Sequence, residues 1–348
     1  MSRITLFAAV LMTSLPALAT AAVAEKIVIS NWDGYMPKDL PEKFKAATGI
    51  DVEVAVHSTN EEIMGKVTAS GGQGFDVLFV SSPFAEALNQ LGLLTPIDHA
   101  KVGNFKNLYP EAAKLAHDPG NTFSVPYAWG TTGLCYRSDL VTTAPTSWND
   151  LLKPADALKG KITMLATDRW LMAAGELAAG FSVNEADPAK LEQVKAQLIE
   201  TKKSLLAYDD TKFYEKLVSG EALMTHAWDG WCNYGTASNP AIKYVVPKEG
   251  SDLWVDTMVI TKAAANPDGA HKFINFVLQA ENGKWVVENI MYKTPNKAGM
   301  DALDPAMLTQ YPNMAYAPAD LLKYEQLRDL GAGMQGFSKA VTEILSAK

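Results

Sequence analysis

The stretch Asp76-Val77-Leu78-Phe79-Val80-Ser81-Ser82-Pro83 predicts a buried strand that turns directly into a helix. Its apolar run shows no alternation, which is typical of a strand covered by helices on both faces of a parallel sheet. Pro83 fits the first turn of the following helix, because the N–H that proline lacks has no helical partner there. This junction favours an α/β fold.

The same strand-then-helix pattern continues on both sides of this stretch. Strands are predicted at 26–30, 52–56, 123–127, 134–136, 161–165, 241–246 and 254–260. Helices are predicted at 38–47, 60–70, 189–201, 269–278 and 282–289. Repeated units of this kind imply layered α/β domains, and the length of the chain suits two of them. Since no low-complexity linker separates two halves, we expect several chain crossings at a hinge.

The N-terminus predicts a secretory signal peptide over residues 1–22. Arg3 supplies a positive charge, an apolar run follows from Ile4 to about Leu18, and small residues then cluster in patterns that signal peptidase accepts. The apolar run is shorter than the ~20 residues needed to span a bilayer, which argues against a membrane anchor. We therefore expect an exported, periplasmic protein. Separately, we expect a monomer.

Charge and cysteine content narrow the partners and the compartment. The formal charge of −8 argues against nucleic acid and anionic membrane as partners, and it is compatible with a cationic ligand. In an oxidising compartment Cys135 and Cys232 either form a disulfide or remain two buried thiols. Spacing alone does not separate these alternatives, because a disulfide requires a short distance in space.

No catalytic constellation is visible along the chain. The five histidines are scattered, without metal-ligand spacing, and neither a GxSxG nucleophile elbow nor a P-loop is present. We therefore expect no enzyme activity, no metal and no cofactor. An exported hydrolase remains the alternative from a different class, and turnover of an ester or amide would support it.

Tryptophans are the informative residues, because several of the eight lie in turns beside polar residues. The turn tryptophans are Trp32, Trp129, Trp170, Trp228, Trp231 and Trp254. Aromatic side chains at strand–helix junctions can line a cleft at the strand ends. Aromatic faces attract cations, and carboxylates pair with ammonium groups. The combination predicts a site for an organic amine.

The order of these junction motifs resembles the periplasmic spermidine- and putrescine-binding proteins over nearly the whole mature chain. The matching stretches are Asn31-Trp32 with Tyr35, Ala47-Thr48-Gly49-Ile50, Phe75-Asp76-Val77, Val125-Pro126-Tyr127-Ala128-Trp129-Gly130, Thr146-Ser147-Trp148, Trp228 with Gly230, Pro247-Lys248-Glu249-Gly250, Trp254-Val255-Asp256, and Tyr292 with Thr294-Pro295-Asn296.

The resemblance implies the two-lobed periplasmic-binding-protein fold, in which each lobe is a mixed sheet flanked by helices and the ligand lies in the cleft. By that analogy residues 25–130 and 257–300 form lobe one, and residues 131–256 and 301–348 form lobe two. It also implies that the chain delivers its ligand to the membrane permease of an ABC transporter. A sensing role with the same fold remains open.

The resemblance also implies the roles of aromatic residues. Trp32 matches an aromatic that packs on the ligand, and Trp228 and Trp254 match aromatics that sandwich an aliphatic chain. Tyr292 matches a tyrosine at the pocket edge.

Carboxylates and their replacements decide the expected ligand. Ser81 matches a serine facing the cleft, and Asp256 matches the carboxylate that binds an amino group. Three other positions that are acidic in the family carry no carboxylate here. They are occupied by Gly34, which has Asp33 beside it, by Trp170 and by Trp231. The sequence thus predicts one ammonium site and an aromatic box.

A single ammonium site favours a short ω-amino acid such as 4-aminobutyrate (GABA). Its carboxylate would meet Arg169, Ser81 or a backbone donor, although an arginine at position 169 also occurs in some spermidine binders and can be structural. The alternative is putrescine, spermidine or another amine, because Asp229 or Asp33 could restore a second ammonium site.

Overall fold

The computed structural model describes residues 25–348, so the predicted signal peptide over 1–22 lies outside the described residues. The strands are β1 Lys26–Trp32, β2 Asp51–His57, β3 Val77–Ser81, β4 Leu94–Thr95, β5 Val125–Arg137, β6 Ile162–Met164, β7 Ala207–Tyr208, β8 Met224–Trp228, β9 Ile242–Val245, β10 Asp252–Thr261 and β11 Glu325–Gln326. The α-helices are α1 Leu40–Thr48, α2 Asn60–Ser70, α3 Ser82–Gln90, α4 Trp148–Leu152, α5 Asp168–Ala178, α6 Pro188–Lys202, α7 Phe213–Ser219, α8 Asp229–Ser238, α9 Pro267–Val277, α10 Ala280–Ile290, α11 Lys297–Asp301, α12 Pro305–Gln310, α13 Pro318–Leu321 and α14 Met334–Ser346.

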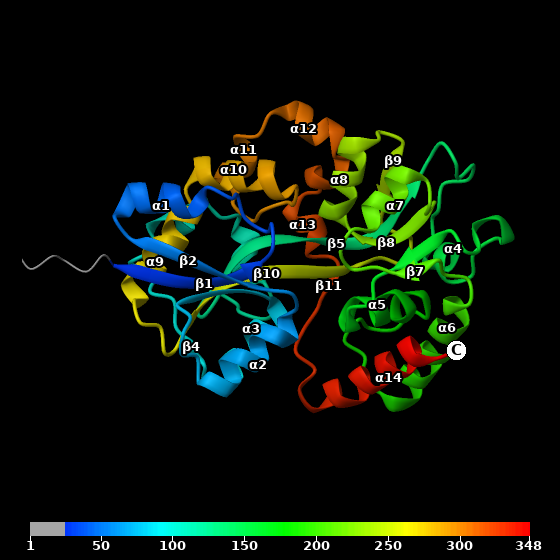
Figure 1. The fold of residues 1–348 in the computed structure, drawn as a ribbon, viewed down its shortest axis with the longest axis horizontal. Coiled ribbons are helices and arrows are strands. Elements are labelled where there is room, and N and C mark those ends of the chain that lie inside the picture. Colours follow the sequence, from blue (N-terminus) through cyan, green and yellow to red (C-terminus); the bar gives the residue numbers. More distant parts are fainter. Residues whose placement is uncertain (1–24) are drawn as a thin grey trace, which may run out of the picture.

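Strand β3 is buried along its whole length, as its unbroken apolar sequence predicts. It pairs in parallel with β1 and antiparallel with β10, so the sheet is mixed. The main strand order is β2-β1-β3-β10-β5-β8-β6-β7, with β4 and β11 on β10 and β9 on β5. Helices cover this sheet on both sides, which confirms the predicted α/β class (Figure 1).

Strand β5 differs from the prediction of two short strands around Gly130 and Gly133. It is a single strand of 13 residues, and both glycines lie inside it. A Cβ on Gly130 would lie 2.6 Å from the carboxylate oxygens of Asp229 and 2.6 Å from the ring of Trp254. The glycine therefore marks a close approach of neighbouring side chains rather than a turn.

Strand β5 runs through both halves of the molecule, and β10 lies beside it from the centre into the half that holds β3 and β4 (Figure 1). Residues 125–131 of β5 pair with β10, whereas residues 132–137 pair with β8 and β9. Around these two long strands, β1, β2 and β3 gather with α1, α2, α3 and α9 on one side. On the other side β6, β7 and β8 gather with α4 to α8 and α14.

The C-terminal part of the chain makes a third crossing between the halves. Leu303, Tyr311 and Met314 pack against Val287 of α10, and Leu321 packs against Trp129 and Leu253 on the central strands. Only after β11 does the chain reach α14, whose buried face packs with α5 and α6. The lobe boundaries expected from the sequence stay a prediction, and these contacts favour a third crossing near residues 327–333.

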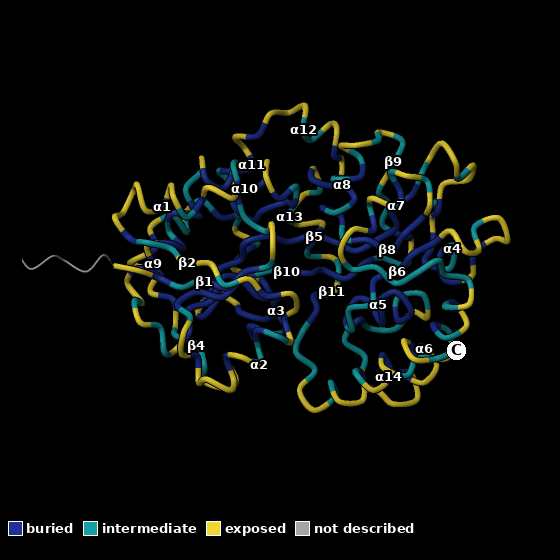
Figure 2. The backbone as a smooth tube through the Cα atoms, viewed as in Figure 1, coloured by how far each residue is buried: buried dark blue, intermediate teal, exposed yellow. Residues whose placement is uncertain are grey.

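Buried residues concentrate on the strands and on the inner faces of the helices (Figure 2). Ile27, Ile29, Phe79, Val125 and Met258 belong to one large apolar cluster that extends along the central strands. Within residues 25–348 no helix has both the length and the apolar content required to span a bilayer. The apolar cluster holds the central strands in place, and the side chains at their ends form the site described next.

Candidate ligand-binding site

Strand β10 carries a carboxylate, an indole and a second carboxylate on one face. Asp252, Trp254 and Asp256 are two residues apart, and side chains at this spacing point to the same side of a strand. The opposite residues on β5 are small, because Trp254 faces Gly130 and Asp256 faces Ala128. The small residues leave room for larger groups above the middle of the sheet.

Asp256 is held by two hydroxyl groups from elements in the first half of the molecule. Ser81 at the end of β3 donates to one carboxylate oxygen at 2.6 Å, and Tyr35 donates to the other at 2.7 Å. Tyr127 fixes the Tyr35 backbone through a 2.8 Å hydrogen bond from its hydroxyl. Burial raises the pKa of Asp256 to about 6, although both hydroxyl bonds oppose that change. The carboxylate is therefore placed but lacks a cationic partner.

Asp229 begins α8 directly after β8 and lies above Gly130, close to Trp254. It is 3% exposed, and its carboxylate accepts a hydrogen bond from the backbone N–H of Gly230 at 2.9 Å. Burial raises the pKa of Asp229 to about 7, whereas the positive charge of Lys293 lowers it. Lys293 is itself buried, which lowers its pKa to about 8. With a pKa of about 8 the lysine is mainly charged at neutral pH, so it compensates part of the Asp229 charge without forming an ion pair.

Asp252 supplies a third buried carboxylate at the start of β10. Thr132 donates a hydrogen bond to one of its oxygens, and the other oxygen has no hydrogen-bond partner. Burial raises the pKa of Asp252 to about 6. The indole N–H of Trp170 faces this carboxylate and lowers its pKa, although its geometry falls short of a hydrogen bond.

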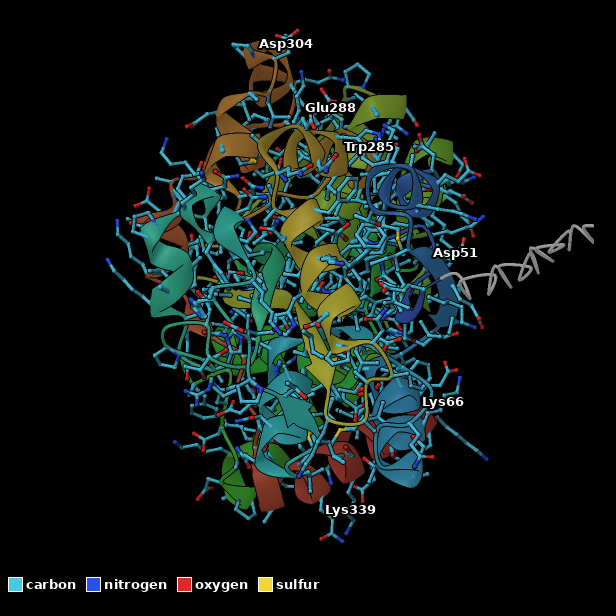
Figure 3. All side chains as sticks on the ribbon, turned by 90° about the vertical axis from the view of Figure 1, so that its left-hand side faces the viewer. Asp51, Lys66, Trp285, Glu288, Asp304 and Lys339 are labelled. Atoms are coloured by element: carbon cyan, nitrogen blue, oxygen red, sulfur yellow. A yellow bond between two sulfur atoms is a disulfide. The ribbon has the colours of Figure 1, made fainter. Side chains whose placement is uncertain are left out.

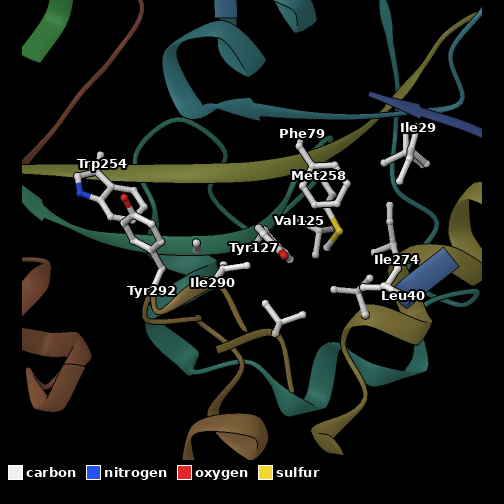
Figure 4. Close-up of a cluster of buried hydrophobic side chains, with 14 of the residues drawn as sticks. Ile29, Leu40, Phe79, Val125, Tyr127, Trp254, Met258, Ile274, Ile290 and Tyr292 are labelled. Carbon is white, nitrogen blue, oxygen red and sulfur yellow. The ribbon is translucent and has the colours of Figure 1, made fainter. Parts of the chain in front are cut away.

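Aromatic rings form a continuous chain from β1 to β10. Tyr35 has edge contacts with Trp32 at 5.4 Å and with Tyr292 at 5.6 Å, measured between ring centroids. Tyr292 in turn contacts Trp254 at 5.3 Å, with the two rings nearly perpendicular (Figure 4). Gly230 allows this approach, since a Cβ there would lie 2.2 Å from the Tyr292 ring. The structure thus brings Trp32, Trp254 and Tyr292 together as predicted site residues.

A second aromatic group lies in the other half of the molecule. Trp170 at the start of α5 contacts Trp228 edge-on at 5.5 Å. Trp231 packs instead on Phe213 and Tyr214 of α7, at 5.9 and 5.3 Å. Trp170 and Trp228 therefore lie together, whereas Trp231 extends this group towards α7.

Asp33 lies apart from the three carboxylates, whereas the charge of Arg169 acts on Asp252 without forming an ion pair with it. The Arg169 guanidinium donates to the backbone oxygens of Val183 and Arg328, at 3.0 and 2.5 Å, and to the side chain of Asn184 at 2.8 Å. These bonds tie α5 to the segment that crosses to α14, which is a structural role. Asp33 is exposed in the turn after β1.

A hollow of about 630 Å³ lies between α2 and α3 on one side and α5 and α14 on the other. Among the predicted site residues only Arg169 lines it, and most of the other lining residues are apolar. The hollow therefore borders the gap between the two halves but does not contain the carboxylates. The aromatic and acidic residues are packed against one another outside this hollow.

The ion pairs of the described residues lie mainly near the surface, where Lys66 meets Glu62 at 2.6 Å and Lys45 meets Asp51 at 2.6 Å. The charged side chains labelled in Figure 3 lie around the outside of the molecule. In residues 25–348 no ion pair involves Asp229, Asp252 or Asp256. A charge buried without a partner is unfavourable by several kcal/mol in rough terms, and the raised pKa values of these carboxyl groups reflect that cost.

Sequence reasoning missed Tyr35 and Asp252 as site residues and gave Asp229 only as an alternative. The signal for Tyr35 was its position three residues after Trp32, in a motif that was otherwise recognised. The signal for Asp252 was its two-residue spacing from Trp254 and Asp256 on one strand.

A disulfide joins Cys135 on β5 to Cys232 on α8, with a Cα–Cα distance of 5.9 Å. This bond ties the helix that begins with Asp229 to the central strand beneath it.

Across the described part of the chain, no group of three or more His, Cys, Asp or Glu residues could hold a metal ion.

The family model of the bacterial extracellular solute-binding proteins matches residues 39–316 of this chain. The chain belongs to this family. The spermidine/putrescine-binding periplasmic protein 1 of Haemophilus influenzae is 31% identical over 335 residues, which are 95% of this chain and 92% of that protein. This similarity confirms the resemblance to the spermidine- and putrescine-binding proteins and the predicted periplasmic location. As a member of a solute-binding family the chain is not an enzyme.

Solved structures agree with the family. A putative spermidine/putrescine ABC transporter protein from Listeria monocytogenes superposes with a TM-score of 0.86 at 30% identity, covering 93% of this chain and all of that chain. This match confirms the periplasmic-binding-protein fold. A protein named as a GABA receptor superposes with a TM-score of 0.72 over 92% of this chain and 97% of its own, but at 21% identity that likeness concerns the fold alone.

Proposed function

We propose that this protein captures a polyamine of the spermidine and putrescine type as the solute-binding component of an ABC importer. The observation that carries the proposal is the set of carboxylates on Asp229 and Asp252, which are buried, and on Asp256, which is partly buried; none has an ion-pair partner among the described residues. Ammonium groups of a ligand would supply the missing charge, and the surrounding indole and phenol rings would cover its carbon chain.

The relatives support the same ligand class, because the Haemophilus influenzae and Listeria monocytogenes proteins are both named for spermidine and putrescine. The ω-amino acid favoured by the sequence lacks such support. Its carboxylate would need a free cationic donor, and three Arg169 hydrogen bonds already go to protein oxygens. A second negative group would also be repelled by the carboxylates that line the site.

Closure of the two lobes is the mechanism that we propose for capture. A ligand that contacts both halves stabilises the closed arrangement over an open one by its differential affinity. Asp256 contacts Ser81 and Tyr35 on one side, whereas Asp229 begins a helix on the other side. A ligand bound to both would hold the halves together, and the closed form would dock on the membrane permease.

Thermal unfolding with a ligand panel tests the proposal. Putrescine, spermidine, cadaverine and 4-aminobutyrate would each be added at several concentrations, since a bound ligand raises the unfolding temperature according to its concentration relative to Kd. We expect a shift with at least one polyamine and none with 4-aminobutyrate at the same concentration. A shift with 4-aminobutyrate and none with the three amines would reject the proposal. Calorimetry on the strongest ligand would then give the stoichiometry, expected to be one.

A further inference from the structure

Arg328, in the third crossing, contacts a helix from each half of the molecule. Its guanidinium donates two hydrogen bonds to the two carboxylate oxygens of Glu86 on α3, the one from Nε at 2.9 Å. Its backbone oxygen accepts a hydrogen bond from the guanidinium of Arg169 in the first turn of α5. Helix α3 packs with β3 in one half, and α5 packs with α6 and α14 in the other (Figure 1). A single residue therefore connects the two halves.

The side of α3 that carries Glu86 holds the crossing at two further points. Ser82, one helical turn before Glu86, donates from its hydroxyl to the backbone oxygen of Leu327 at 3.3 Å. The backbone N–H of Asp329 donates to the Glu86 carboxylate at 3.1 Å. Three consecutive residues of the crossing are thus bonded to one helix of the first half.

The other half holds the same segment through the turn after α5. The side-chain oxygen of Asn184 accepts the backbone N–H of Arg328 and a bond from Arg169, both at 2.8 Å. The carboxylate of Glu325 accepts bonds from the hydroxyl of Ser182 at 2.6 Å and from the side-chain amide of Asn184 at 2.9 Å. The crossing is therefore bonded on both sides, and a movement of one half relative to the other acts on these bonds.

Both helices place site residues at their N-terminal ends. Ser81 directly precedes α3 and donates to Asp256, and Trp170 lies in the first turn of α5. The separation of α3 and α5 thus sets the separation of these two parts of the site. In the part of the chain that the structure describes, no hydrogen bond joins Glu86 or Arg328 to the three site carboxylates. The pair can act on the site only through the positions of the helices.

The Glu86–Arg328 ion pair is of intermediate exposure, at 13% for the Glu86 side chain and 37% for that of Arg328. Burial alone would raise the pKa of Glu86, but the bonds from Arg328 and from the Asp329 backbone hold it below its usual value. The pair is therefore charged at neutral pH. Its two-bond geometry is stronger than a single contact, whereas access to solvent weakens it, which suits a contact that forms and breaks.

We propose that Arg328 is a positioning residue, which clasps α3 to α5 in the closed arrangement and slows the release of the ligand. The inference rests on the proposed function, in which the two halves close around a polyamine. Opening moves α3 away from α5, and a segment bonded to both helices resists that separation. Entry of a ligand into the open cleft does not use these bonds. Loss of the clasp should therefore raise the dissociation rate and leave the association rate.

Stopped-flow fluorescence with putrescine and spermidine measures both rates, since several tryptophans lie in the site. In Glu86→Gln and in Arg328→Gln the dissociation rate should rise about three- to tenfold, with the association rate within about twofold of the parent. The double variant should match the single variants, because all three lose the same contact. Asp139→Asn is the matched control, since Asp139 accepts two 2.8 Å bonds from the Arg137 guanidinium within one half. The control should keep both parent rates.

Thermal unfolding without ligand shows whether each variant is folded. Glu86→Gln changes only the charge of a side chain on a helix surface, so it serves even if Arg328→Gln does not fold. A parent-like dissociation rate in folded Glu86→Gln overturns the clasp, as does a double variant whose effect is the product of the two single effects. Either result leaves the polyamine function standing. Failure of the parent to bind both polyamines rejects the proposed function and the clasp with it.

Discussion

Replacing Asp256 with Asn should weaken polyamine binding about 10- to 150-fold, since it removes the charged partner of one ammonium group. A hydrogen bond to a charged group contributes about 1.5–3 kcal/mol, and about 1.4 kcal/mol corresponds to a factor of ten in affinity. Ser81 and Tyr35 can remain hydrogen-bonded to the amide, so the local geometry should be retained. The variant therefore isolates the charge.

The same substitution should not destabilise the unligated protein. Raising the pKa of Asp256 from 3.8 to about 6 corresponds to an unfavourable contribution of at most about 3 kcal/mol at pH 8. Solvent reduces this figure, because the side chain is partly exposed. Loss of the charge should thus leave the unfolding temperature equal or higher, which excludes misfolding as the cause of weak binding.

Calorimetry at pH 8 with putrescine and spermidine measures the affinity, and thermal unfolding without ligand measures the stability. Asp268→Asn is the control, because Asp268 is an exposed carboxylate in the first turn of α9 that meets Lys101 at 2.6 Å. The control should bind like the parent. An Asp256→Asn affinity within threefold of the parent would refute the reasoning.

Three further predictions concern pH, packing and the disulfide. Between pH 6.5 and 8 the unfolding temperature of the unligated parent should fall relative to that of Asp229→Asn, because folding raises the pKa of Asp229 to about 7 and its stabilising protonation is lost as pH rises; parallel curves would contradict this. In Gly130→Ala the new Cβ would lie 2.6 Å from the Asp229 carboxylate and from Trp254. Calorimetry should then show at least tenfold weaker binding, and denaturant unfolding should show a free energy of unfolding lower by about 1–3 kcal/mol. Gly336→Ala, at an open helical position, is the control and should change neither quantity. Replacing Cys135 and Cys232 together with Ser should lower the free energy of unfolding by about 2–4 kcal/mol, and equal denaturant midpoints in parent and variant would count against a stabilising disulfide.

Much of the fold was predictable because its signals are local. The apolar run of β3 and the Gly at the end of α1 depend on neighbouring residues only, and both elements are present within two residues of the predicted bounds. The continuity of β5 was not predictable, because Gly130 and Gly133 resemble turn residues until the side chains that crowd them are known. Close approach between distant segments leaves no local pattern.

The site, too, was predictable where its signals are local and not where they depend on distant segments. Trp32, Ser81, Trp254, Asp256 and Tyr292 were identified from their motifs, and the structure brings them together. A single ammonium site was expected because Trp170 and Trp231 replace carboxylates of the family. Carboxylates from neighbouring positions lie in the same region, since sheet register places Asp252 beside Thr132 and helix α8 places Asp229 above Gly130. Register depends on pairing partners far away in the chain.

The hollow between α3 and α14 offers positions for fluorescent labels that would report the movement of the two lobes. Gln90 and Ser338 line it from opposite halves, and neither belongs to the acidic and aromatic cluster. A donor and an acceptor dye attached there would report lobe movement as energy transfer without touching the ligand. Such a labelled protein would serve as an optical sensor for its own ligand, and its signal would be independent of any heat of binding.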